Sequence, residues 1–157
     1  MSASIRRLTA ADVGHTPAYL RVHQFNDNAQ RLTRTLTDAL DLQRIGLHLV
    51  RLEGGRDSTQ FHYHDTDEEF VYILAGRGIA QLGEQSIEVH AGDFMGFPAP
   101  SCGHSLHNPD AEDLVYLMGG ERNPADVVHY PRIRRTMIKS HGRRSWVDWD
   151  NLHDLPG

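Results

Sequence analysis

Residues 62–76 read HYHDTDEEFVYILAG and hold two histidines two positions apart, with a pair of acidic residues shortly after them. In an extended strand, residues i and i+2 face the same side, so His62 and His64 converge while Tyr63 points away. A turn through Asp65, Thr66 and Asp67 can bring one of the acidic residues back beside the imidazoles. This stretch therefore predicts two strands around a metal site.

A second stretch, GDFMGFPAPSCGHSLHN at residues 92–108, supplies another histidine. The spacings G-x6-H-x-H-x4-E-x6-G, from Gly55 to Gly76, and G-x5-P-x5-H-x3-N, from Gly92 to Asn108, together resemble the two motifs of the cupin superfamily. The resemblance covers roughly residues 42–120. It implies an all-β fold, a single antiparallel jelly-roll barrel, with the metal ligands His62, His64, Glu69 and His104.

Two departures from the family pattern lie in loops. One extra residue precedes His62 and one precedes His104, so neither departure removes a ligand. The continuation ERNPADVVHYP after Gly120 is similar to a group of small bacterial cupins. That similarity bears on the fold more than on the function.

The donor set indicates which metals to expect. Three neutral imidazoles and a carboxylate suit one divalent transition metal ion, namely Fe, Mn, Ni, Co, Cu or Zn, better than Ca or Mg. Four protein ligands leave about two positions open on an octahedral ion, where a substrate can bind. By analogy with cupins, the chain is expected to be an oxygenase, isomerase or decarboxylase acting on a small polar or aromatic acid. A non-catalytic barrel that binds or senses a small molecule stays open, because fold alone does not settle function.

Glu68 and Glu69 must point to opposite faces of one strand, so only one of them can reach the ion. Glu69 has the cupin spacing of six residues to Gly76, and Glu68 continues the acidic run of Asp65 and Asp67. Glu69 is therefore the predicted ligand.

Other residues near the motifs are candidates for the pocket wall. The candidates are Arg44, His48, Phe70 and Tyr72. If Arg44 points inward, it would favour a substrate with a carboxylate or phosphate group. Asn108 is expected to shape a turn and His107 to lie on the surface. Cys102, the single cysteine, excludes an internal disulfide, and its thiol either fills a loop or lies near the metal.

The composition fits one globular domain: 157 residues, 39% hydrophobic and 24% charged. No apolar run is long enough for a membrane span, and Arg6 and Arg7 are not followed by a hydrophobic segment, so a cytoplasmic location is expected. Residues 132–157 carry 6 Lys and Arg against 3 Asp and Glu, while the whole chain has net charge −5. The basic segment lacks interleaved aromatic residues, which argues against nucleic acid as a partner.

Three regions are expected: an N-terminal arm at 1–40, a cupin barrel at 41–131 and a C-terminal arm at 132–157. In the first arm, Leu32, Leu36 and Leu40 recur every four residues and suggest one short amphipathic helix. The second arm should lie on the acidic barrel, either its own or a partner's. Strand edges and the apolar residues of both arms, such as Leu20, Phe25, Trp146 and Trp149, favour a homodimer.

The barrel segment alternates short apolar runs with turn residues, which is typical of a closed or sandwiched β-structure. Hairpin turns are expected at Gly76-Arg77-Gly78 and Leu82-Gly83-Glu84. The expected strands are 45–52, 59–64, 68–76, 78–83, 86–90, 93–98, 103–108 and 113–120.

Overall fold

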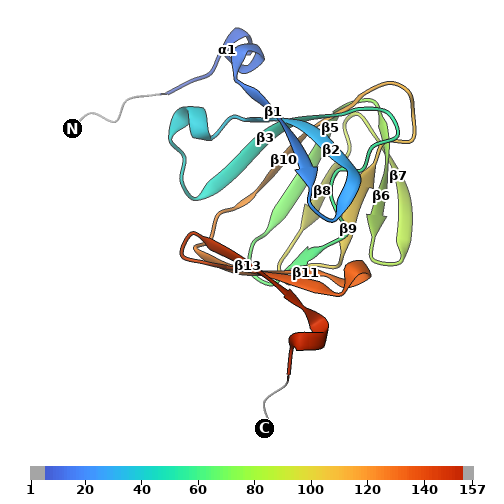
Figure 1. Cartoon of the computed structure of the whole chain (residues 1–157). Coiled ribbons are helices and arrows are strands. Elements are labelled where there is room, and N and C mark those ends of the chain that lie inside the picture. The colour runs from blue at the N-terminus through green and yellow to red at the C-terminus, as the bar shows by residue number, and fades with distance from the viewer. Residues whose placement is uncertain (1–5, 154–157) are drawn as a thin grey trace, which may run out of the picture.

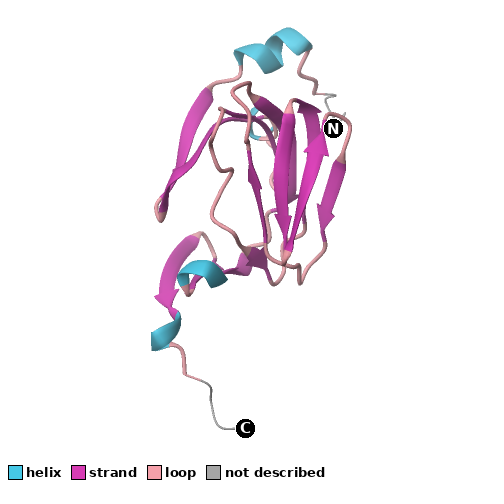
Figure 2. Ribbon diagram, turned by 90° about the vertical axis from the view of Figure 1, so that its right-hand side faces the viewer, coloured by secondary structure: helices cyan, strands magenta, loops and turns pink. Residues whose placement is uncertain are grey.

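The computed structural model describes residues 6–153, and antiparallel strands form most of it (Figures 1 and 2). The all-β prediction is confirmed. In chain order the elements are α1 Ala10–His15, β1 Ala18–His23, β2 Asn26–Thr35, η1 Asp38–Leu40, β3 Ile45–Leu52, β4 Tyr63–His64, β5 Glu69–Ala75, β6 Arg77–Leu82, β7 Gln85–His90, β8 Phe94–Phe97, β9 His104–His107, β10 Leu114–Glu121, β11 Ala125–Tyr130, η2 Pro131–Ile133, β12 Arg135–Ser140, β13 Arg143–Asp148 and η3 Trp149–Asn151.

Two sheets enclose the hydrophobic core in a jelly-roll arrangement. The larger has the strand order β1-β2-β3-β10-β5-β8, and the smaller has the order β7-β6-β9. In β3, for example, the alternate residues Val50 and Leu52 face inward. The buried core consists of Val50, Leu52, Ile73, Ala80, Val89, Leu106, Leu114 and Tyr116.

A third sheet, β13-β12-β11-β4, lies across one end of the barrel (Figure 1). Its edge strand β4 carries His64, which pairs with Val128 of β11. Pro124 and Pro131 bracket the strand β11. The expected C-terminal arm is thus largely strand, and Lys139 of β12 forms a largely buried ion pair with Asp67 at 2.6 Å. This sheet fixes one side of the histidine motif.

The prediction of a helix through Leu32, Leu36 and Leu40 is wrong. β2 runs through Thr35 and pairs with both β1 and β3, so it extends the larger sheet, and only the short η1 follows it. A spacing of four residues puts side chains on one side of a strand as well as of a helix, and the β-branched Thr33 and Thr35 favour the strand. The expected boundary between the N-terminal arm and the barrel, at residue 41, therefore lies between β2 and β3, two strands that pair with each other in one sheet.

One of the two expected hairpin turns is confirmed. Leu82 pairs with Gln85 across the turn Gly83-Glu84, and Gly83 has φ 57°. The other is wrong, because β5 and β6 belong to different sheets and Gly76 joins them. Gly76 has φ 84°, and a Cβ there would lie 2.6 Å from the carbonyl oxygen of Asp113, so this crossover requires glycine.

The aromatic residues of the two arms pack on each other. The ring of Trp146 lies 4.9 Å from that of Phe25 and 5.0 Å from that of Tyr130, centre to centre. Trp149 donates a hydrogen bond to the hydroxyl of Thr136 at 2.9 Å. No helix within residues 6–153 is both long and apolar enough to cross a bilayer.

Candidate metal centre

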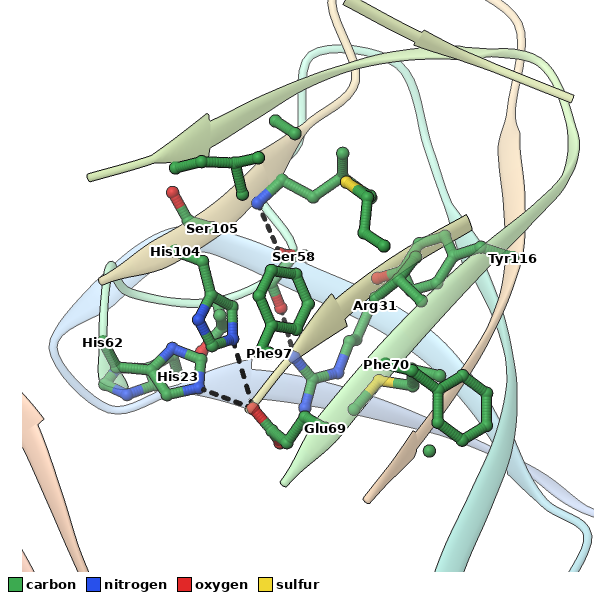
Figure 3. A pocket seen from close by; sticks show the side chains of 18 of the residues that line it. His23, Arg31, Ser58, His62, Glu69, Phe70, Phe97, His104, Ser105 and Tyr116 are labelled. Atoms are coloured by element: carbon green, nitrogen blue, oxygen red, sulfur yellow. Dashed lines mark hydrogen bonds and ion pairs between the residues drawn. The ribbon is translucent and has the colours of Figure 1, made fainter. Parts of the chain in front are cut away.

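Three imidazoles converge on one carboxylate oxygen at the edge of the barrel. Oε2 of Glu69 lies 3.2 Å from Nε2 of His64, 3.2 Å from Nε2 of His104 and 3.5 Å from Nε2 of His62. His62, Glu69 and His104 are shown in Figure 3. His62 and His64 lie on or beside β4, Glu69 begins β5 and His104 begins β9. The structure thus brings together all four residues that the sequence predicted as ligands.

Each imidazole is held by a second contact through its other nitrogen. Nδ1 of His64 lies 2.6 Å from Oδ2 of Asp126, while Nδ1 of His62 and of His104 lie 2.9 Å and 3.2 Å from the carbonyl oxygens of Gln60 and Cys102. These acceptors keep a proton on Nδ1, so each Nε2 can bind a metal once it has lost its own proton. The donor set therefore fits a divalent transition metal with imidazole and carboxylate ligands.

Asp126 also orders the turn between β4 and β5. It is buried, and its Oδ1 accepts hydrogen bonds from the backbone N–H of Thr66 at 3.0 Å and of Asp67 at 3.3 Å. The same carboxylate therefore positions His64 and the turn that returns the chain to Glu69.

The electrostatics of the cluster reflect its charge pairing. Burial alone would raise the pKa of Glu69, but hydrogen bonds from His104, His62 and His64 hold it well below its ordinary value. Burial opposes charge on His64, yet the hydrogen bonds and charges of Glu69 and Asp126 outweigh it and raise the pKa of His64 to about 9. For His62, which has no such second carboxylate, burial dominates and lowers the pKa.

A cavity of about 210 Å³ opens beside the cluster and extends into the barrel (Figure 3). One wall is aromatic: the ring of Phe97 stacks on His104 at 3.8 Å and that of Tyr130 on His62 at 5.6 Å, centre to centre. Leu82, Met95 and Met118 add apolar surface. On another side, a groove of about 790 Å³ reaches His64 and Glu69. The cluster is therefore accessible to a small molecule.

The expected pocket residues are only partly in place. Phe70 lines the cavity, whereas Arg44 and Tyr72 are exposed and line neither space. His48 lies in the wider groove, with Nδ1 3.0 Å from the hydroxyl of Thr35. The arginine that lines the cavity is Arg31 of β2. The sequence reasoning missed it because no strand was expected before residue 45.

The remaining predicted residues lie apart from the cluster. Glu68 is exposed, and His107 contacts Asp57 at 2.8 Å. Asn108 shapes its turn as expected, because its amide donates to the carbonyls of Leu52 and Glu112. Among residues 6–153, two groups of side chains lie close enough to share a metal ion, His62 with Glu69 and His104, and His64 with Asp67 and Asp126; Cys102 belongs to neither.

Besides Arg31, the sequence reasoning missed His23, Tyr130 and Asp126. His23 and Tyr130 line the cavity and Asp126 supports His64. All four lie outside the two motifs, and Asp126 is one of 21 acidic residues, so nothing in the local pattern marked it. The alternation of β11, with Asp126, Val128 and Tyr130 on the buried side, is the one signal that could have placed Asp126 inward.

The fold and the cluster define a small jelly-roll protein with a candidate metal centre. The family profile described as Cupin domain matches residues 48–120. A protein proposed to be a sugar phosphate isomerase, from Acidithiobacillus ferrooxidans, is 34% identical; the match covers 96% of this chain and 97% of that one, with a TM-score of 0.92. The chain belongs to the cupin superfamily.

Two further solved structures agree in fold, and one further protein matches in sequence. A sugar phosphate isomerase of the cupin superfamily from Silicibacter pomeroyi is 24% identical, with 93% of this chain and 94% of that one covered and a TM-score of 0.81. A predicted oxalate decarboxylase from Thermotoga maritima is 19% identical over 71% of this chain and 96% of that one, with a TM-score of 0.60. An uncharacterised protein of Methanocaldococcus jannaschii is 42% identical over 50 residues, which are 32% of this chain and 39% of that protein.

Proposed function

We propose that this chain is a divalent-metal-dependent enzyme that isomerises a small phosphorylated hydroxy-carbonyl compound, such as a sugar phosphate. The convergence of three imidazole Nε2 atoms on Oε2 of Glu69, beside a cavity, is the observation that carries the proposal. The similarity over nearly the whole length to the Acidithiobacillus ferrooxidans protein supports the reaction type.

In this proposal His62, His64, Glu69 and His104 hold the metal. When bound, the ion would polarise a carbonyl or hydroxyl oxygen of the substrate as a Lewis acid. The aromatic and methionine side chains of the cavity exclude water around the reacting carbons, which strengthens the electrostatic interactions there.

His23 is the cavity residue suited to bind a substrate oxygen. Its Nδ1 accepts a hydrogen bond from the backbone N–H of Phe25 at 3.2 Å, so in the neutral ring the proton is on Nε2, a donor. Burial, with smaller effects from the neighbouring His62 and Arg31, lowers the pKa of His23 to about 4. The ring is therefore neutral near pH 7 and donates a hydrogen bond without adding a charge.

The test is interconversion of aldose and ketose phosphates by protein loaded separately with Mn, Fe, Co, Ni or Zn, followed by nuclear magnetic resonance. We expect conversion with at least one metal, its loss after chelation and its return when that metal is restored. The His104→Ala variant should be inactive under the same conditions. Saturable binding without conversion under any metal would instead support the non-catalytic binding barrel.

A further inference from the structure

The cavity beside the metal centre contains polar groups that nothing in the fold satisfies. Within residues 6–153, four buried side-chain atoms have no hydrogen-bond partner. Two of them belong to residues that line this cavity, namely Nε of Arg31 and the hydroxyl of Tyr116. Buried polar groups nearly always have a hydrogen-bond partner. Two such groups without a partner in one cavity therefore indicate that the cavity binds a polar ligand.

The strand register places these two side chains on one face of the sheet. Thr33 of β2 pairs with Val50 of β3, and Val50 pairs with Tyr116 of β10, so Thr33 and Tyr116 occupy one row across the sheet. Arg31 precedes Thr33 by two positions and faces the same side. Figure 3 shows Arg31 and Tyr116 around the cavity that also contains His62, Glu69 and His104.

Arg31 carries a charge that the described part of the chain does not neutralise. Its guanidinium donates to the carbonyl oxygen of Ser58, and it forms no ion pair with a carboxylate among residues 6–153. By contrast, Arg77 forms ion pairs with both Asp110 and Glu88. A guanidinium has five N–H donors in a fork that matches an oxyanion.

Tyr116 is suited to donate a hydrogen bond to the same oxyanion as Arg31. Its side chain is only 1% exposed, and burial raises its pKa to about 12, so the hydroxyl keeps its proton at neutral pH. The surrounding core of Val50, Ile73 and Leu114 offers it no acceptor.

We propose that Arg31 and the Tyr116 hydroxyl form an oxyanion subsite that holds the carboxylate or phosphate group of the ligand, while the rest of the ligand faces the metal centre. The inference rests on the proposed function in assuming that one molecule occupies the whole cavity. Arg31 lies outside residues 48–120, so the subsite depends on the N-terminal strands that this chain adds to the matched cupin segment. The subsite selects anionic over neutral ligands.

The test uses the full-length, metal-stripped chain, titrated with inorganic phosphate and, separately, with acetate, and followed by shifts of its amide resonances. The Arg31→Gln variant should bind the preferred anion about tenfold more weakly or worse, since charge-assisted hydrogen bonds are lost. Arg44→Gln, which removes the same charge from an exposed position outside the cavity, should bind as the wild type does. Preference for phosphate would identify a phosphorylated ligand, and preference for acetate a carboxylate.

A second variant separates binding from folding. Tyr116→Phe removes a hydroxyl that has no partner, so the melting temperature should stay the same or rise, while anion affinity falls several-fold. This variant also keeps the test valid if Arg31→Gln does not fold. No anion binding by the wild type, or equal affinity in the wild type and the folded variants, would overturn the subsite. Because neither metal nor turnover is involved, that failure is distinct from absence of isomerase activity.

Discussion

Nδ1 of His64 lies 2.6 Å from Oδ2 of Asp126, a residue 62 positions further along the chain. The contact joins His64 of β4 to the neighbouring strand β11, which lies outside both cupin motifs. It fixes the orientation of the imidazole and leaves its Nε2 directed at Glu69.

Replacing Asp126 by Asn should therefore weaken metal binding, by about tenfold or more on the scale of disturbed metal-site shells. Chelator competition measures the affinity. Asp65→Asn is the matched control, because Asp65 contacts His129 rather than a cluster residue, and it should change little. Equal affinities of the two variants would show that the Asp126 contact does not support the site.

The adjacent acids give a second prediction. Glu69→Gln should weaken metal binding about tenfold or more, since Oε2 of Glu69 is where the three imidazoles meet. Glu68→Gln should be nearly silent, because its side chain is exposed. Calorimetric titration of metal-stripped protein compares them, and the reverse order would refute the assigned ligand.

Much of this site could be predicted from the sequence because strand alternation and turn spacing are local. His62, His64 and Glu69 fall within eight residues, and the sheet period decides which side chains meet. Alternation along β11 could have turned Asp126 and Tyr130 inward, but it could not place them, or Arg31, beside the cluster, since that depends on the pairing of strands distant in the chain. The error at Leu32 and Leu36 shows the same limit: a repeat of four residues fits both a helix and a strand until the pairing partner β3 is known.

Stability of the metal-free protein should depend on His64. Its pKa is raised to about 9 in the folded chain, against about 6.5 for an unfolded histidine. Because the pKa of His64 is higher in the folded state, protonation of His64 stabilises the folded protein. This stabilisation is complete below about pH 6.5 and is lost as the pH rises through about 9. Between about pH 6 and 10, the melting temperature of the wild type should therefore fall more steeply with increasing pH than that of His64→Gln. Parallel curves for the two proteins would be inconsistent with the charge pairing of His64.

We also propose a homodimer, formed through the exposed edge strand β1. Among residues 6–153, β1 pairs only with β2, and it exposes Tyr19, Leu20 and Val22 at 55%, 62% and 50%. Phe25 and Trp146, also considered for the interface, instead pack on each other. Light scattering should give twice the chain mass at tens of micromolar, and Leu20→Asp should reduce it. Leu152→Asp, at a comparably exposed position, is the control. A monomeric wild type would refute the dimer.

The central claim is that the cluster binds a metal, and elemental analysis of the purified protein tests it most directly. We expect about one divalent transition metal ion per chain, since three converging imidazoles and a carboxylate form a complete donor set. His64→Ala should lose most of the metal, whereas His107→Ala, a residue that contacts Asp57 instead, should retain it. Metal-free wild-type protein that cannot be loaded, or equal occupancy in the two variants, would contradict the account.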